Sequence, residues 1–291
     1  MPERATSPIS SLPNELILSI FCSLPSFSDV AYFAATCRLY RILWINQAFS
    51  IFTNVGPRTI PCRKFARTLL ADQGGPSVTA NRLALQDVLQ LIRNAKVVEL
   101  NIAQFNAQWM PALKVFHMSR APKPKALSAN ERHRFARGIY QLWSFFIVDR
   151  ATRQRRLGTL KLKYLLVISE LLTFYFWHFE EDPKRRAILI DDGNPYDEVF
   201  ADCYMTLAEA LREHHGDESG SWQLTESDGI GGRFSLWDPY QGLLKEMVLF
   251  GASRDRNRKS PPLPSPQSVW DDTSDDDRAE GVEPSVSRHT T

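Results

Sequence analysis

The feature that most constrains this fold is a run of large apolar residues near the start of the chain, cut by prolines into short pieces. The run LPNELILSIFCSLPSFSDVAYFAATCRLYRILW covers residues 12–44. Pro13 suits the first turn of a helix, where its missing N–H costs nothing, and Pro25 ends that helix. Between the two prolines, apolar residues recur at helical spacing, namely Leu16, Ile17, Ile20, Phe21 and Leu24.

Two more short helices are predicted in the same run. Ser28 can cap a second helix, with Asp29 at the positive end of its dipole. Cys37-Arg38 begins a third segment. The apolar face of this third segment is predicted to consist of Leu39, Ile42 and Leu43.

Three such helices are too small to enclose a core. Domains below roughly 40 residues usually need a disulfide, a metal or a partner. The four cysteines contain no CxxC pair and no metal-binding spacing, so they are interpreted as reduced thiols; they are Cys22, Cys37, Cys62 and Cys203. We therefore expect no metal, no cofactor, and a protein partner for the opening segment.

The rest of the chain is predicted to be helical as well. Residues 62–72 are predicted to form a helix that ends before two glycines. From Leu85 to Ile92, apolar residues recur at helical spacing, which predicts another helix. Residues 97–100 fit either a short strand or a helix end, and prolines favour a connecting loop over much of residues 101–127. Because no alternating strand pattern persists, the fold class is predicted to be mainly α.

The clearest local signal is the capping box formed by Ser128 and Glu131, which opens a helix with an aromatic stripe. A second helix, over residues 160–179, is apolar nearly all round and is predicted to lie at the centre of the core. Asn194-Pro195 predicts the start of a third helix. The row of basic residues from Arg150 to Lys163 is interpreted as a solvated loop, with contact to an acidic peptide as the alternative.

Composition argues against nucleic acid and membrane as partners. Lys and Arg number 35 against 33 Asp and Glu, so the formal net charge is only +2. No strong field is therefore available to attract nucleic acid or anionic lipid. The best candidate for a membrane span, residues 163–179, contains Lys163 and Glu170 and falls short of the ~20 apolar residues that a span needs. With no secretory signal at its start, the chain is expected in the cytoplasm, the nucleus or both.

From residue 253 the composition changes. The stretch RDRNRKSPPLPSPQ is basic and proline-rich, and WDDTSDDDRAE is acidic. Such a segment buries too little apolar surface to offset the entropy of ordering, so residues 253–291 are predicted to be disordered. Thr273 and Ser274 precede three aspartates, which suggests phosphorylation by acid-directed kinases. Mass spectrometry of this peptide from growing cells tests that hypothesis.

The opening segment resembles the F-box over about residues 9–50. The F-box pattern is a Leu-Pro pair, a Glu-Leu soon after, an Ile/Leu-Phe/Leu pair one turn on, an Asp near the second helix, then Cys/Ser-Arg and a later Trp. This sequence carries Leu12-Pro13, Glu15-Leu16, Ile20-Phe21, Leu24, Asp29-Val30, Cys37-Arg38 and Trp44. The alternative is an ordinary three-helix segment that packs onto the rest of the same chain.

The resemblance implies a partner and a set of contact residues. F-box proteins dock on the Skp adaptor of SCF-type cullin–RING ubiquitin ligases, and through it on a cullin. The adaptor-binding residues implied here are Leu12, Pro13, Leu16, Ile20, Phe21, Leu24, Val30, Cys37 and Arg38. Residues 127–149 also resemble, more loosely, a segment of fungal F-box proteins whose targets are unassigned.

These observations predict a domain order and a function. Residues 9–50 form the F-box, 51–127 a helical connector, 128–252 a helical body that binds an unknown protein target, and 253–291 the tail. The chain is expected to be a non-catalytic substrate receptor rather than an enzyme. The alternatives are an F-box scaffold or regulator outside a complete ligase and, from another class, a helical enzyme with an unrecognised site.

Overall fold

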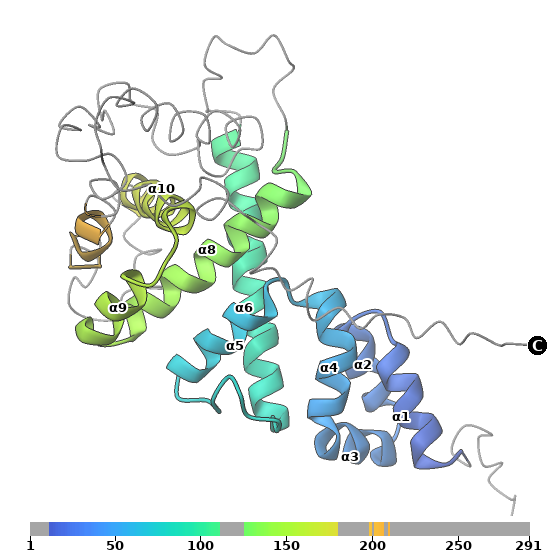
Figure 1. The fold of residues 1–291 in the computed structure, drawn as a ribbon. Helices are drawn as coiled ribbons and strands as arrows, with labels where there is room; N and C mark the ends of the chain where they lie inside the picture. The colour runs from blue at the N-terminus through green and yellow to red at the C-terminus, as the bar shows by residue number, and fades with distance from the viewer. Residues whose placement is uncertain (1–11, 111–124, 180–197, 200, 207–208, 210–291) are drawn as a thin grey trace, which may run out of the picture. The chain divides into compact units, whose positions relative to one another are not determined.

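The computed structural model describes residues 12–110, 125–179, 198–199, 201–206 and 209 (Figure 1). Over these residues the chain is mainly α-helical, which confirms the predicted fold class. The chain divides into two compact units, residues 1–100 and 101–291, and the division falls inside one long helix. The predicted tail and the start of the helix predicted at Asn194-Pro195 lie outside the described residues.

The first unit holds six helices in the part of the chain described, the last of which continues past residue 100. They are α1 (Asn14–Ser23), α2 (Phe27–Ala35), α3 (Arg38–Asn46), α4 (Ala48–Thr59), α5 (Arg63–Asp72) and α6 (Leu85–Gln104). The three short helices predicted between residues 12 and 44 are therefore present. The start of α2 differs from the prediction: Ser26, not Ser28, is its cap, and the Ser26 hydroxyl oxygen accepts from the Asp29 backbone N–H at 3.2 Å.

The helix α4, which the sequence did not predict, completes the core of the first three. It contacts α1, α2 and α3 and buries Ala48, Ile51, Phe52 and Val55, the i, i+3, i+4, i+7 pattern of one helix face. The Phe52 ring stacks on Phe27 with centroids 6.3 Å apart. The reasoning that only a foreign partner could supply a core is therefore wrong, because the chain supplies one side of it itself.

The helices α5 and α6 are held by buried polar groups. The Arg67 guanidinium donates to the backbone carbonyls of Ser77, Val78 and Ala80, which ties the connection between the helices to α5. The buried Asn94 amide donates to the Gln73 side chain at 2.8 Å. Residues 97–100 are helical, and the helix continues into a π-helix, η2 (Phe105–Trp109), so the connecting loop predicted from residue 101 is wrong as far as residue 110.

The second unit is built around a pair of packed helices. They are α8 (Ala129–Ile147) and α10 (Leu162–Phe179), and the short α9 (Arg150–Leu157) lies between them in sequence (Figure 1). The predicted capping box is confirmed: Ser128 Oγ accepts from the Glu131 N–H at 3.2 Å, and Glu131 Oε2 accepts from the Ser128 N–H at 2.8 Å. No helix in the part of the chain described is long and apolar enough to span a membrane.

The side chains of α10 are described over residues 164–172, and most of them are buried, as a central place in the core requires. The buried residues are Tyr164, Leu165, Val167, Ile168, Leu171 and Leu172. The Arg137 guanidinium of α8 lies over the Tyr164 ring, 4.0 Å from its centroid. Phe135 of α8 meets Phe105 of η2 edge to face at 5.0 Å. Apolar and aromatic contacts therefore join η2, α8 and α10.

Candidate functional site

One side of α1 remains exposed although its other side is fully buried. Ile17 and Phe21 have no exposed surface, whereas Leu16 is 52% exposed. Pro13 is exposed, and Leu12, Ile20 and Leu24 are partly exposed. Leu16 and Ile20, four residues apart, share one face of α1, and Leu12 lies just before the helix and its cap Pro13. We call Leu12, Leu16 and Ile20 the α1 stripe. Leu16 and Ile20, from the Glu-Leu and Ile/Leu-Phe/Leu positions of the F-box pattern, thus lie on the exposed side of α1, and the Leu-Pro pair lies just before the helix.

Two of the predicted contact residues lie inside the first unit. Phe21 and Val30 both have no exposed surface. The Phe21 ring meets Phe33 edge to face at 4.8 Å, and Phe33 in turn stacks on Tyr40 at 4.7 Å. These two residues therefore support the surface from within the core and are not available to touch a partner.

Cys37 and Arg38 lie at the start of α3, just after the end of α2. Cys37 is the residue before α3 and is partly exposed, and Arg38 begins the helix and is exposed. Their position at a helix start follows the sequence prediction. The nine predicted residues therefore lie in or next to α1, α2 and the start of α3, with Phe21 and Val30 in the core and the others at least partly exposed.

The orientation of α3 differs from the sequence prediction and reveals residues that the prediction missed. Leu39, Ile42 and Leu43 were predicted to form one apolar face, but in the structure Tyr40 and Leu43 are the buried residues of α3. Leu39, Ile42 and Ile45 are 39%, 44% and 46% exposed. We call these three residues the α3 stripe. Since α3 is apolar over more than half of its circumference, periodicity alone could not tell which side is covered.

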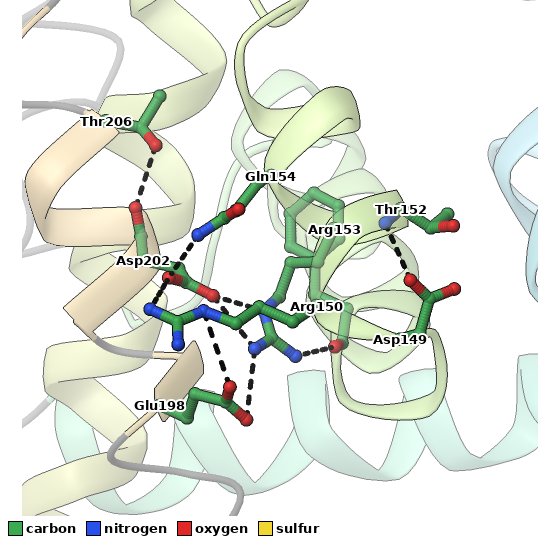
Figure 2. Close-up of polar contacts among 9 residues, drawn as sticks. Asp149, Arg150, Thr152, Arg153, Gln154, Glu198, Asp202 and Thr206 are labelled. Atoms are coloured by element: carbon green, nitrogen blue, oxygen red, sulfur yellow. Dashed lines mark hydrogen bonds and ion pairs between the residues drawn. The ribbon is translucent and has the colours of Figure 1, made fainter.

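A second candidate is a cluster of ionised side chains in the second unit (Figure 2). Arg150, Arg153 and Gln154 project from α9 toward Glu198 and Asp202, as Figure 2 shows. Arg153 Nε donates to Asp202 Oδ2 at 2.9 Å, and Arg153 Nη2 lies 2.8 Å from the same oxygen. Gln154 Nε2 donates to the other carboxylate oxygen of Asp202 at 3.1 Å. Arg153 and Asp202 are both buried.

Further contacts complete this cluster. Arg153 Nη2 also lies 3.3 Å from Glu198, and Arg153 Nη1 donates to the Phe145 carbonyl at 3.3 Å. Arg150 reaches Glu198 and Asp202 at 3.5 and 3.4 Å. The interpretation of this basic row as a solvated loop is therefore wrong for residues 150–157, which form a helix. Two of its arginines already bind carboxylates of the same unit.

The electrostatics of the cluster favour the ionised pair. Burial alone would raise the pKa of Asp202, but hydrogen bonds from Arg153 and Gln154 and the charges of Arg153 and Arg150 outweigh it and lower that pKa. Asp149 caps α9, and the hydrogen bond from the Thr152 N–H lowers its pKa. The adjacent Cys203 is buried, and burial raises its pKa to about 12. This arrangement fixes a structure and holds no reactive nucleophile at neutral pH.

The described residues offer no metal centre, since no group of three or more His, Cys, Asp or Glu side chains among them could hold a metal ion. The predicted phosphorylation positions, Thr273 and Ser274, lie outside the described residues. Comparisons with models of known families, with characterised proteins and with solved structures find no match to this chain. The F-box resemblance therefore stays a prediction from the residues.

Proposed function

We propose that this chain is a non-catalytic substrate receptor whose opening helices bind the Skp adaptor of an SCF-type ubiquitin ligase. The observation that carries the proposal is the α1 stripe, in which Leu16 is 52% exposed and Leu12 and Ile20 are partly exposed, whereas Ile17 and Phe21 of α1 are buried. Complete burial of an exposed Leu or Ile side chain contributes about 1.5–3 kcal/mol, so covering the exposed part of these three side chains contributes a share of that to association. These residues occupy the Leu-Pro and Leu/Ile positions of the F-box pattern.

The mechanism that follows is proximity. The second unit holds a protein target while the opening helices hold the adaptor, and a cullin joins the adaptor to the ubiquitin-loaded enzyme. Transfer of ubiquitin then becomes effectively unimolecular. No residue of this chain performs covalent chemistry in this proposal, because the ubiquitin thioester belongs to another subunit.

The test is co-purification with the adaptor from cells and from purified components. We expect Leu12→Ala with Pro13→Ala to lower adaptor affinity by about tenfold or more, because both side chains lie outside the core and truncation of the few residues that dominate an interface costs over 1 kcal/mol each. Circular dichroism should be unchanged. Leu100→Ala is the matched control, since Leu100 is an apolar residue of α6 that is 60% exposed.

The outcomes separate the candidate functions. Recovery of the adaptor together with a cullin supports a substrate receptor. Recovery of the adaptor alone supports a scaffold or regulator outside a complete ligase. Recovery of neither rejects both, and wild-type affinity in the double variant rejects the assignment of Leu12 and Pro13 to the contact. A form lacking residues 9–50, used to trap targets for mass spectrometry, then identifies what the second unit binds.

A further inference from the structure

The outward side of α9 carries positive charge that the buried cluster does not use. α9 contains four arginines and no acidic residue. Arg150 and Arg153 bind carboxylates, whereas Arg155 makes no hydrogen bond or ion pair with the described residues. Arg155 is exposed, and since an α-helix has 3.6 residues per turn, it lies opposite the buried Arg153 and Leu157. Its guanidinium is therefore open to a ligand from elsewhere.

Two further cations follow Arg155 closely in the chain. Arg156 is partly exposed and donates through Nη1 to the uncharged Ser144 Oγ at 2.7 Å. The chain then turns tightly, because the Arg156 carbonyl accepts from the Thr159 N–H at 3.1 Å, and it leads to the partly exposed Lys161. We call Arg155, Arg156 and Lys161 the α9 cations.

The densest run of carboxylates in the sequence belongs to the same unit as α9. Five aspartates occupy residues 271–277, which read DDTSDDD and lie outside the described residues. The chain leads to this run from the helical residues 198–206, which are held against α9 by the 2.8 Å contact between Arg153 and Asp202. At ~3.3–3.6 Å per residue, the 61 residues between Glu209 and Asp271 are long enough to return to α9. The acidic run is therefore tethered within reach of the α9 cations.

We infer that residues 271–277 bind the α9 cations within the same chain and cover this side of α9. Guanidinium groups pair with carboxylates through directed N–H···O bonds, and the tether raises the effective concentration of the run at α9. Nucleic acid is a poor fit, because the net charge is only +2 and the acidic run repels phosphates. An acidic segment of another protein would have to displace the tethered run.

The contact supplies a means of regulation. Phosphorylation of Thr273 and Ser274, which lie inside the acidic run, adds about −1.5 to −2 charges each and strengthens binding to the α9 cations. Salt weakens it, because the α9 cations lie at the surface. The access of other acidic ligands to α9 therefore depends on the charge of the tail. This inference does not depend on adaptor binding.

The test is zero-length cross-linking of the full chain with a carbodiimide, which joins an amine to a carboxylate only where the two groups touch. A cation in the last turn of α9 stabilises the helix with or without a partner, so the readout must be contact and not stability. In the Arg155→Lys variant we expect peptide mass spectrometry to find a cross-link from position 155 to residues 271–277. Its yield should be several-fold above that of the matched control Arg132→Lys, an exposed arginine of α8, and should fall as salt is added.

Three results would overturn the inference. The first is an equal yield in Arg155→Lys and Arg132→Lys at low salt. The second is cross-linking of the acidic run mainly to Lys259, which would assign the run to the basic stretch of the tail itself. The third comes from a mixture of chains labelled with light and heavy nitrogen, where cross-links that combine both labels would assign the contact to a second copy.

Discussion

At the scale of single residues, Gly138 decides how closely α8 approaches α10. A Cβ atom placed on Gly138 would fall inside the contact distance of Leu171 Cδ1 and 3.0 Å from Val167 Cγ1. Both neighbours are buried, at 0% and 3% exposure, so neither has space to move aside. The absence of a side chain at this position is therefore a packing requirement of the helix pair.

We predict that Gly138→Ala destabilises the second unit by about 1–3 kcal/mol, the usual cost of overpacking a core. The loss should exceed the gain of up to ~1 kcal/mol that alanine brings to a helix interior. Urea unfolding followed by circular dichroism measures the change. Gly158→Ala is the matched control, because its Cβ would lie at ordinary contact distance, 3.5 Å from the Gln154 carbonyl. Equal stability of the two variants would contradict the prediction.

The residue scale also shows what sequence reasoning can and cannot assign. The role of Ser128 could be predicted because its partner, Glu131, lies three residues away in a recognisable box. The role of Arg153 could not, because its partner, Asp202, lies 49 residues further along the chain. From local sequence alone, a row of basic residues is interpreted as solvent-exposed, because a carboxylate partner that is distant in sequence cannot be recognised.

At the scale of elements, the Arg153–Asp202 pair fastens the helical residues around 198–206 to α9. Both side chains are buried, so removal of one leaves an uncompensated charge in the core. We predict that Asp202→Asn destabilises the second unit by about 3 kcal/mol. Replacing both partners by apolar residues, as in Arg153→Met with Asp202→Leu, should recover much of that loss. Urea unfolding of Arg153→Met, Asp202→Leu and the double variant measures the coupling, and additive losses would contradict it.

The same pair predicts how stability depends on pH. The folded state holds the Asp202 pKa below its ordinary value of 3.8, so the unfolded chain binds the proton more readily. The contribution of the pair is therefore fully present above about pH 4 and is lost as pH falls through the lower folded pKa. Asp202→Asn cannot titrate at this position. The gap between wild type and variant in thermal melts should narrow below about pH 4, and a constant gap would refute the assignment.

Elements also differ in how well the sequence predicted them. The start of α8 was predicted because its flanking residues, Ser128 and Glu131, form a capping box. The helix α4 was missed, and it contains Gly56 and Pro57, residues that normally argue against a helix. Pro57 lacks the backbone N–H that a helix uses there, so it removes one bond from the last turn of α4. The outward face of α3 was missed because burial depends on α1, α2 and α4, which local periodicity does not describe.

At the scale of the whole molecule, the four cysteines are distributed over both units and differ in solvent exposure. Cys62 and Cys203 are buried, whereas Cys22 and Cys37 are partly exposed. Burial raises the pKa of the Cys22 thiol, against a hydrogen bond from Ser50 and the charge of Arg58. Burial raises the pKa of Cys203 to about 12, so at neutral pH it holds almost no reactive thiolate.

We therefore predict an order of alkylation for the native chain at neutral pH. Iodoacetamide should modify Cys37 and then Cys22, and should leave Cys62 and Cys203 unmodified until denaturant exposes them. Peptide mass spectrometry at a series of times measures the order. Because Cys37 belongs to the predicted adaptor contact, the bound adaptor should slow its modification while Cys62 and Cys203 stay unreactive. Early modification of Cys203 would show that the second unit is not packed around Asp202 as described.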